Sequence, residues 1–468
     1  MQNIFLLAVI FYFTQISYAQ NVHQYSVEEL QEDYQELRDH IETKNPIAYL
    51  YQSQEVVTAY LDGIEKDISK PMTELDFYRL ISPVSSLIKD GHNFIMPSPQ
   101  TISYIKKHPH ILPLEMAFLE NDVFVLNNYS ENNVLDQKYK IHSINDVSIE
   151  SIIKKFYLVL PREGLQTQLT KNYINKWFRF LYHLHFGFKE EYKIQYSHFN
   201  NEIKEVSIKG LALDEMNKRK DILKNTVQKN KGISIELVEY REKTLLLKVP
   251  SFAPSVLKET HSQADFKKEI DRCFDAVLDK NVEHLIIDLR ENNGGNPMYS
   301  VYLLKYLMDK PFVHAIEGRV VKDAEKETVL ERTKKKWYPW YGIGQFKPKK
   351  KHYSGKIYVL IGGGTFSAAV EFCSTLKKYK RATFIGEETG GNPIVMSGNY
   401  LKANRSLKNT NITHSSGNIC TIYDELEKND GRGIIPDYAV VLDIDDLTLE
   451  RDVFMDRVVR YIQLSSNK

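Results

Sequence analysis

Cysteine is scarce in this chain of 468 residues, which has only Cys273, Cys373 and Cys420. Three thiols cannot form a disulfide-dense scaffold, and no Cys-x-x-Cys pair or Cys/His cluster indicates structural zinc. An excess of one charge is also absent, because 62 basic and 61 acidic residues give a formal net charge of +1. This balance excludes a strongly basic nucleic-acid binder and an acidic disordered chain. We therefore expect no nucleic-acid partner.

Long apolar runs are lacking as well. The longest N-terminal run covers residues 4–13, whereas about 20 residues are needed to span a bilayer. Ser17-Tyr18-Ala19 follows it and is a small-x-small pattern that a signal peptidase could cut, although no Lys or Arg precedes the run. We expect a signal peptide over 1–19 and an exported, periplasmic or secreted protein without stable membrane insertion. A retained anchor and a plain N-terminal helix are the alternatives.

The pattern along the chain predicts three parts after the signal peptide. Residues 20–110 have helical periodicity, with a capping box at Ser26 and a second helix that opens at Thr73 and ends near His92. Residues 111–225 mix short strands with helix and include a turn at Asn145-Asp146. Residues 230–468 alternate buried strands, at 284–289, 356–361 and 382–386, with helices. This alternation predicts a layered α/β core, and the Lys- and Trp-rich stretch 335–353 reads as an exposed loop.

Two glycine-rich turns follow buried strands of the predicted core. In Gly362-Gly-Gly-Thr-Phe-Ser-Ala-Ala, Ser367 stands at a helix start, where a nucleophilic serine is exposed near the positive end of the helix dipole. The same position suits a serine that only caps the helix. In Asp288-Leu-Arg-Glu-Asn-Asn-Gly-Gly, backbone N–H groups could point into a cleft and stabilise an oxyanion. A tight turn with Asp288 paired to Arg290 explains that pattern equally well.

Two further segments carry groups that could assist a serine. Asp90-Gly91-His92 offers an imidazole, although a lone histidine at a helix end is more often a cap or a surface residue. Asp430-Gly-Arg-Gly-Ile-Ile-Pro-Asp offers carboxylates, although glycine and proline there also fit a simple turn before a strand. A nucleophilic serine needs a base, and an acid commonly orients that base.

Taken together in this order, the motifs resemble the C-terminal-processing (tail-specific) serine protease family. The resemblance rests on four elements over about 285–440: Asp288-Leu-Arg-x-Asn-x-Gly-Gly, Gly-Gly-Thr-Phe-Ser-Ala-Ala, Arg381-Ala-Thr-x-x-Gly-Glu-x-Thr-Gly-Gly and Gly-x-Gly-Ile-x-Pro-Asp. The family includes the tricorn core protease and the interphotoreceptor retinoid-binding protein modules. The resemblance implies a ClpP/crotonase-like α/β core that hydrolyses peptide bonds through an acyl-enzyme, without a cofactor.

The resemblance also implies roles for particular residues. Ser367 matches the nucleophile, and the backbone N–H groups of Ala368 and of Gly294 or Gly295 match the oxyanion hole. The lysine of Ser/Lys family members has no counterpart in Gly386-Glu-Glu-Thr-Gly-Gly-Asn. Asp90-Gly91-His92 resembles the N-terminal element that supplies the histidine of the tricorn-like branch, and this resemblance implies that His92 is the base.

The third catalytic residue in that branch is an acid. Asp430 appears at the matching position, with Glu427 and Glu425 as rivals. The segment around Ile144-Asn-Asp-Val is similar to the closing part of a PDZ module, which would bind a peptide by strand addition. Its carboxylate-binding glycine loop has no counterpart near 113–125.

Three functions compete at this stage. The first is an exported serine endopeptidase acting on protein or peptide substrates. The second is a non-catalytic binder of an apolar ligand or peptide on the same fold, because fold alone does not fix function. The third, an acyl-CoA enzyme of the crotonase type, is disfavoured by the predicted export. The sequence leaves the oligomeric state open.

Overall fold

The computed structural model describes residues 23–198, 202–223, 234–241, 243–253, 255, 257, 263–320, 342–398, 404–449 and 452–466. The predicted signal peptide and residues 335–341 of the predicted loop lie outside this part of the chain. Within it, no helix is both long and apolar enough to cross a lipid bilayer.

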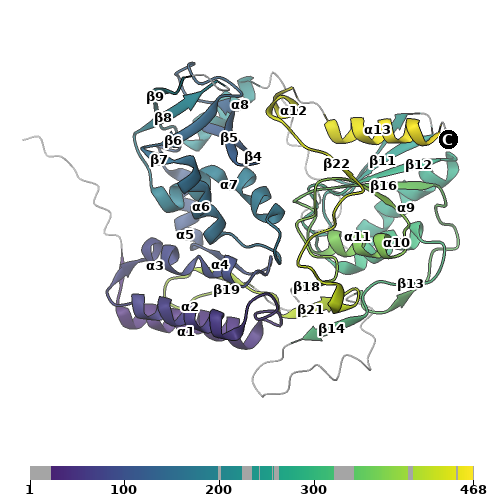
Figure 1. Cartoon of the computed structure of the whole chain (residues 1–468), viewed down its shortest axis with the longest axis horizontal. Coiled ribbons are helices and arrows are strands. Elements are labelled where there is room, and N and C mark those ends of the chain that lie inside the picture. Colours follow the sequence, from purple (N-terminus) through teal and green to yellow (C-terminus); the bar gives the residue numbers. More distant parts are fainter. Residues whose placement is uncertain are drawn as a thin grey trace, which may run out of the picture.

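The N-terminal part is helical (Figure 1). Its helices are α1 (Val27–Lys44), α2 (Gln54–Asp67), α3 (Glu74–Ile81), α4 (Val84–Leu87) and α5 (Pro99–Lys107), with short strands β1 (Gln24–Tyr25), β2 (Met72–Thr73) and β3 (Phe94–Met96). The capping box predicted at Ser26 is present, with Glu29 as its partner. The helix predicted from Thr73 is split at Pro83, because proline lacks the N–H that a continuous helix needs.

The middle part packs two long helices on an antiparallel sheet of order β4-β5-β6-β8-β9. The strands are β4 (Leu114–Leu119), β5 (Asp122–Asn128), β6 (Lys140–Ile144), β7 (Val147–Ser148), β8 (Glu191–Ser197) and β9 (Lys204–Lys209), and the helices α6 (Ile149–Val159), α7 (Gln168–Phe186) and α8 (Leu213–Leu223). Asn145 and Asp146 form the predicted turn, both with positive φ.

The free edge of β4 is covered from within the chain. The Asn175 side chain on α7 accepts the Phe118 N–H at 2.7 Å and donates to the Phe118 carbonyl at 3.1 Å. A peptide that added to this edge at Phe118 would have to displace Asn175, because both backbone groups of Phe118 are already paired. The PDZ-like character of this part stays a prediction.

The predicted layered α/β core is confirmed. Its sheet has the order β10-β11-β12-β16-β17-β22, parallel from β11 to β22 with β10 antiparallel. The strands are β10 (Glu236–Arg241), β11 (Thr244–Lys248), β12 (His284–Asp288), β16 (Lys356–Ile361), β17 (Thr383–Gly386) and β22 (Tyr438–Ala439).

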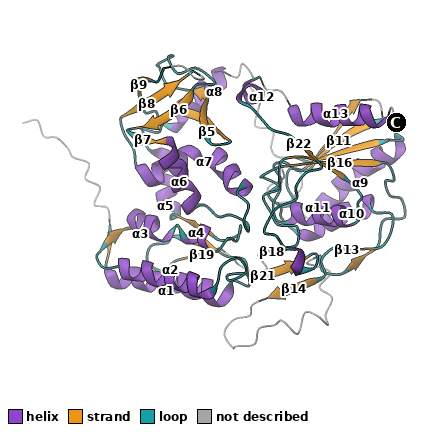
Figure 2. Cartoon of the chain, in the orientation of Figure 1, coloured by secondary structure: helices purple, strands orange, loops and turns teal. Residues whose placement is uncertain are grey.

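Helices cover both faces of this sheet, which explains its continuous apolar strands. Helices α9 (Gln263–Asp279), α10 (Pro297–Leu307) and α11 (Ala368–Lys378) lie on one face, and α13 (Val453–Ser466) lies on the other (Figure 2). Successive side chains of β12 point to opposite faces of the sheet. Ile287 belongs to the hydrophobic core on the face covered by α9, α10 and α11, and Ile286 belongs to the core under α13.

Short strands follow the core helices, and one of them, β20, reaches back to the N-terminal part. They are β13 (Phe312–Val313), β14 (Glu317–Val320), β15 (Gln345–Phe346), β18 (Val395–Gly398), β19 (Asn404–Ser406), β20 (Thr413–Ser415) and β21 (Ile419–Ile422), followed by η4 (Leu426–Lys428) and α12 (Ile444–Thr448). Strand β20 pairs with β3, and Asp33 of α1 accepts the N–H groups of Asn409 and Thr410 at 2.8 Å. These contacts fix the loop between α4 and β3, which carries His92, against the core.

Candidate active site

Ser367 lies on the turn between β16 and α11 in a strained backbone conformation. Its φ is +53° and its ψ is −130°, an unusual combination for a residue with a side chain. It precedes the first residue of α11, yet its side chain makes no capping hydrogen bond. Instead, its Oγ lies 3.2 Å from the Nε2 atom of His92. The interpretation of Ser367 as a simple helix cap therefore fails.

His92 reaches Ser367 from the loop between α4 and β3. The imidazole packs against the Phe366 ring, with 4.6 Å between the ring centroids. The loop approaches closely because residue 91 is glycine: a Cβ there would lie 2.6 Å from the Phe366 ring and 2.9 Å from Leu169. The small residue and the aromatic contact together orient the ring towards the serine.

The other ring nitrogen of His92 faces a second hydroxyl. The Ser397 Oγ lies 3.2 Å from His92 Nδ1 and donates to Asp90 Oδ1 at 2.6 Å, while Asp90 Oδ1 itself lies 3.7 Å from Nδ1. A hydroxyl can donate one hydrogen bond and accept another. A proton on Nδ1 can thus be donated to Ser397, which donates to Asp90, and Nε2 is left to accept the Ser367 hydroxyl.

Asp90 is fully buried and held by several donors. Besides Ser397, it accepts the His92 backbone N–H at 2.9 Å and the Asn45 amide at 3.0 Å. Burial alone would raise the pKa of Asp90, but hydrogen bonding and charge from His92 and the hydrogen bond from Ser397 lower it below its ordinary value. Asp90 is therefore an anion at neutral pH.

A second buried carboxyl, Glu163, contacts the same loop at Gly91. Its Oε2 accepts the Gly91 N–H at 2.9 Å, and its Oε1 has no hydrogen-bond partner among the described residues. Burial and the nearby Asp90 charge raise the pKa of Glu163 well above its ordinary value of 4.5. The pKa values of the two buried carboxyls at the histidine loop are thus shifted in opposite directions, that of Asp90 downwards and that of Glu163 upwards.

The raised pKa of Glu163 predicts a pH dependence of stability. Above pH 4.5 the unfolded chain loses this proton while the folded chain keeps it, so the Glu163 contribution to the unfolding free energy falls as pH rises towards the folded pKa. Glu163→Gln removes that contribution. We measure the unfolding free energy in urea between pH 4.5 and 8. The difference between the variant and wild type should shift in favour of the variant by up to about 1.4 kcal/mol per pH unit as pH rises. The exposed substitution Glu427→Gln is the control, and an unchanged pH slope in Glu163→Gln would contradict the prediction.

The acids predicted from sequence do not lie at the imidazole. Asp430 is exposed, and its carboxylate accepts the Arg432 N–H at 2.9 Å. Glu425 and Glu427 are exposed too, and Glu425 pairs with Lys428 at 3.1 Å. Among the described residues, none of the three contacts His92 or Ser397. The geometry corrects this prediction, because the carboxylate linked to His92 is Asp90.

Of the expected oxyanion donors, Ala368 and Gly294 lie beside Ser367, and Gly294 needs a correction. The Gly294 N–H already donates to the Asn292 side chain at 2.8 Å, so it is not free for an oxyanion. The N–H groups of Ala368 and Gly295 have no acceptor among the described residues. Ala368 follows the serine directly, so its N–H is the best-placed donor for an oxyanion, and the Gly295 N–H, one residue from the Gly294 contact with Ser367, is the second candidate.

The packing of Gly294 on the serine leads to a mutational prediction. An added Cβ would lie 2.6 Å from Ser367 Cβ, and φ is +94°. For Gly294→Ala we expect about 1–3 kcal/mol less unfolding free energy and at least about tenfold slower labelling of Ser367 by a fluorophosphonate. Gly63→Ala, in α2 with nothing within 4 Å, should instead gain about 0.5–1 kcal/mol. Wild-type labelling in Gly294→Ala would contradict the close packing.

Other motif residues form structural ion pairs. Arg290 pairs with Asp288 at 2.7 Å and with Asp452 at 2.9 Å. The pair with Asp288 is the one expected if the 288–295 motif forms a tight structural turn. Sequence reasoning missed Ser397, whose strand segment carries no catalytic pattern, and it did not assign Asp90 a role. Across the described ranges, no group of three or more His, Cys, Asp or Glu is arranged to hold a metal ion.

Comparison with known proteins supports the fold and gives a family match for the core. No curated protein matches the sequence significantly. The crystal structure of mature CPAF is similar at 14% identity and a TM-score of 0.64, covering 90% of this chain and 94% of that one. The structure of mature CPAF complexed with lactacystin is similar at 13% identity and a TM-score of 0.65, and the match covers 94% of this chain and 99% of that one. Residues 243–440, which include Ser367, match the model of peptidase family S41. The family match covers the α/β core with its glycine turns, and it supports the resemblance of this part of the chain to the C-terminal-processing serine proteases.

Proposed function

We propose that the protein hydrolyses peptide bonds with Ser367 as nucleophile, His92 as base and Asp90 as the acid, linked to the histidine through Ser397. The observation that carries the proposal is the 3.2 Å contact between Ser367 Oγ and His92 Nε2, made between residues 275 positions apart. It is supported by the serine's strained φ and by the absence of a capping bond. Strain of this kind concentrates at functional sites.

The steps follow from this geometry. Ser367 Oγ attacks the carbonyl carbon of the scissile bond and loses its proton to His92 Nε2. The N–H groups of Ala368 and Gly295 stabilise the oxyanion, an effect worth about 3–4 kcal/mol per donor. His92 then gives its proton to the leaving nitrogen, and the C–N bond breaks. Water hydrolyses the acyl-enzyme, with His92 again taking and returning a proton.

Asp90 and Ser397 act on the charge that appears on the imidazole. When His92 becomes doubly protonated, Nδ1–H still donates to Ser397, which still donates to the Asp90 carboxylate. The buried anion stabilises the imidazolium and fixes the tautomer. The raised pKa of Glu163, which accepts the Gly91 N–H, disfavours a second negative charge at this loop.

We further propose that the protein is an endopeptidase and that it acts outside the cytoplasm. This proposal rests on the family resemblance and on the signal-peptide pattern at 1–19. N-terminal sequencing of protein recovered from the cell envelope or the medium tests export. A mature terminus after Ala19 would support it, and an intact Met1 would contradict it.

The test of catalysis is active-site labelling followed by peptide hydrolysis. A fluorophosphonate probe should label wild type, and His92→Ala should prevent labelling because the serine loses its base. A peptide library then reports cleavage products by mass spectrometry. Absence of labelling and of cleavage in folded protein would favour the alternative, a non-catalytic binder on this fold.

A further inference from the structure

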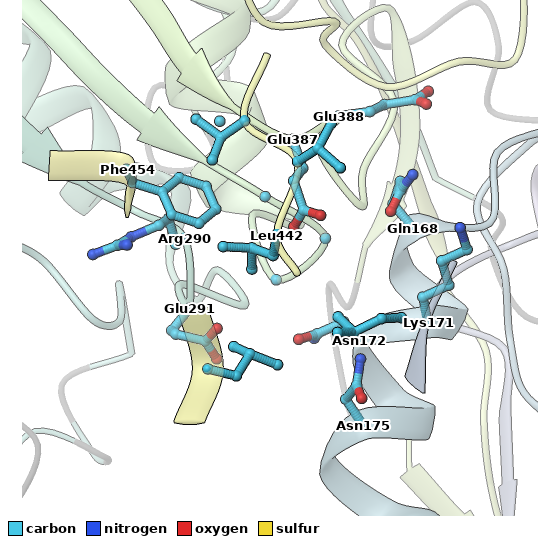
Figure 3. Close-up of a pocket in the computed structure, with 18 of the residues that line it drawn as sticks. Gln168, Lys171, Asn172, Asn175, Arg290, Glu291, Glu387, Glu388, Leu442 and Phe454 are labelled. Atoms are coloured by element: carbon cyan, nitrogen blue, oxygen red, sulfur yellow. The ribbon is translucent and has the colours of Figure 1, made fainter. Parts of the chain in front are cut away.

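A second cleft lies between α7 and the carboxyl-end edge of the core sheet. Its volume is about 1060 Å³, at the upper end of the range for small-ligand sites. Figure 3 shows Glu387 and Arg290 on the core side and Gln168, Lys171 and Asn172 on the α7 side. None of Ser367, His92, Ser397 or Asp90 lines it. It shares only the glycine turn 362–364 with the candidate active site.

Most of the charged groups in this cleft are already paired. Lys176 binds Glu291 at 2.7 Å, and Arg432 binds Glu388 at 2.6 Å. Arg290 is held by Asp288 and Asp452. These pairs stabilise the walls, and they leave little attraction for a ligand charge.

Four charged groups that line the cleft have no such partner in the part of the chain that the structure describes: Glu120 and Lys248, which are exposed, and Lys171 and Glu387, which are partly buried. Among the described residues, no cation lies within ion-pair distance of the Glu387 carboxylate, and no anion lies within that distance of the Lys171 ammonium. Burial raises the pKa of Glu387, Lys171 lowers it in part and Glu291 raises it. Unpaired charges at partly buried positions are costly, and a complementary ligand removes that cost.

Two other features define the rest of a ligand. The Asn172 side-chain nitrogen is buried without an acceptor, next to Lys171 on the same helix. Leu442 and Phe454 provide an apolar surface on the core side of the cleft, where Phe454 lies next to Arg290 (Figure 3). A ligand that satisfies all of these groups has an ammonium, a carboxylate and an apolar side chain.

We propose that this cleft binds a short zwitterionic peptide, with its amino terminus at Glu387, its carboxylate at Lys171 and Asn172, and apolar side chains on Leu442 and Phe454. The proposal does not rest on hydrolysis by Ser367. Peptide fragments are nevertheless the products that a peptidase would release, so such a site would allow released products to influence the enzyme.

The test compares free and blocked peptides by isothermal titration calorimetry. The protein is full-length Ser367→Ala, which prevents hydrolysis, and the probe is the tripeptide Ala-Leu-Leu. We expect N-acetylation or C-amidation each to weaken binding at least about tenfold, because each removes one charge-assisted contact. In Glu387→Gln, the free and N-acetylated peptides should bind alike. In Lys171→Gln, the free and C-amidated peptides should bind alike.

Lys176→Gln is the matched control, since its ammonium lies in the same cleft but is already paired with Glu291. It should change affinity less than about threefold. No binding of the free peptide, equal binding of free and blocked peptides, or an equal loss in Lys176→Gln would each overturn the proposal. The comparison of free with blocked peptides needs no cleft variant, so it decides the matter even if Glu387→Gln fails to fold. Because binding alone is measured, a negative result leaves the proposed catalysis to its own test.

Discussion

Ser367→Ala should lower kcat for peptide hydrolysis by at least about 10⁴-fold, the largest effect that we expect from any single substitution. The alanine lacks the oxygen that attacks the carbonyl and accepts the acyl group. Labelling by a fluorophosphonate should disappear together with hydrolysis. The Michaelis constant should change little, because the hydroxyl contributes to bond making more than to substrate binding.

The matched control for this experiment is Ser374→Ala on the same helix. The Ser374 hydroxyl donates to the Pro393 carbonyl at 2.6 Å and does not contact His92. Its loss should cost about 1 kcal/mol of stability and leave labelling intact. If Ser367→Ala kept labelling, or if both variants lost it equally, Ser367 would not be the nucleophile.

The core of the fold could be predicted because its strands are buried on both faces. Strands such as Lys356–Ile361 are almost continuously apolar and end at glycine turns, a pattern that survives without any knowledge of tertiary contacts. By contrast, β3, β19 and β20 contain three residues each. Segments this short have no period to recognise, and only their pairing across some 320 residues gives them structure.

The candidate site could be predicted only in part, for a related reason. Ser367 and His92 were found through the family resemblance, since nothing local in the sequence connects two residues 275 positions apart. The acid was sought near Asp430 by the same resemblance. The structure instead uses Asp90, two residues before the histidine, where the turn directs the carboxylate back at the His92 N–H. The role of Ser397 depends on where β18 ends, which sequence does not specify.

Asp90→Asn should lower kcat about 10³–10⁴-fold while the Michaelis constant and the overall fold are retained. The amide has nearly the same shape, but it carries no charge to stabilise the imidazolium. Its NH₂ group could also donate to Ser397 and reverse the direction of the hydrogen bonds, which would favour a proton on Nε2 and block the base. Kinetics on a peptide identified by the library screen measure the effect.

Asp430→Asn separates this assignment from the one suggested by resemblance alone. Asp430 is exposed and bonds only the Arg432 N–H among the described residues, so its loss should change kcat less than about threefold. The loss of kcat in Ser397→Ala should lie between the losses in Asp90→Asn and Asp430→Asn. The bridging hydroxyl is lost, but Asp90, at 3.7 Å from His92 Nδ1, still attracts the imidazolium. A large loss in Asp430→Asn with near-normal activity in Asp90→Asn would reverse the assignment. It would require the 424–431 segment to move onto His92 when substrate binds.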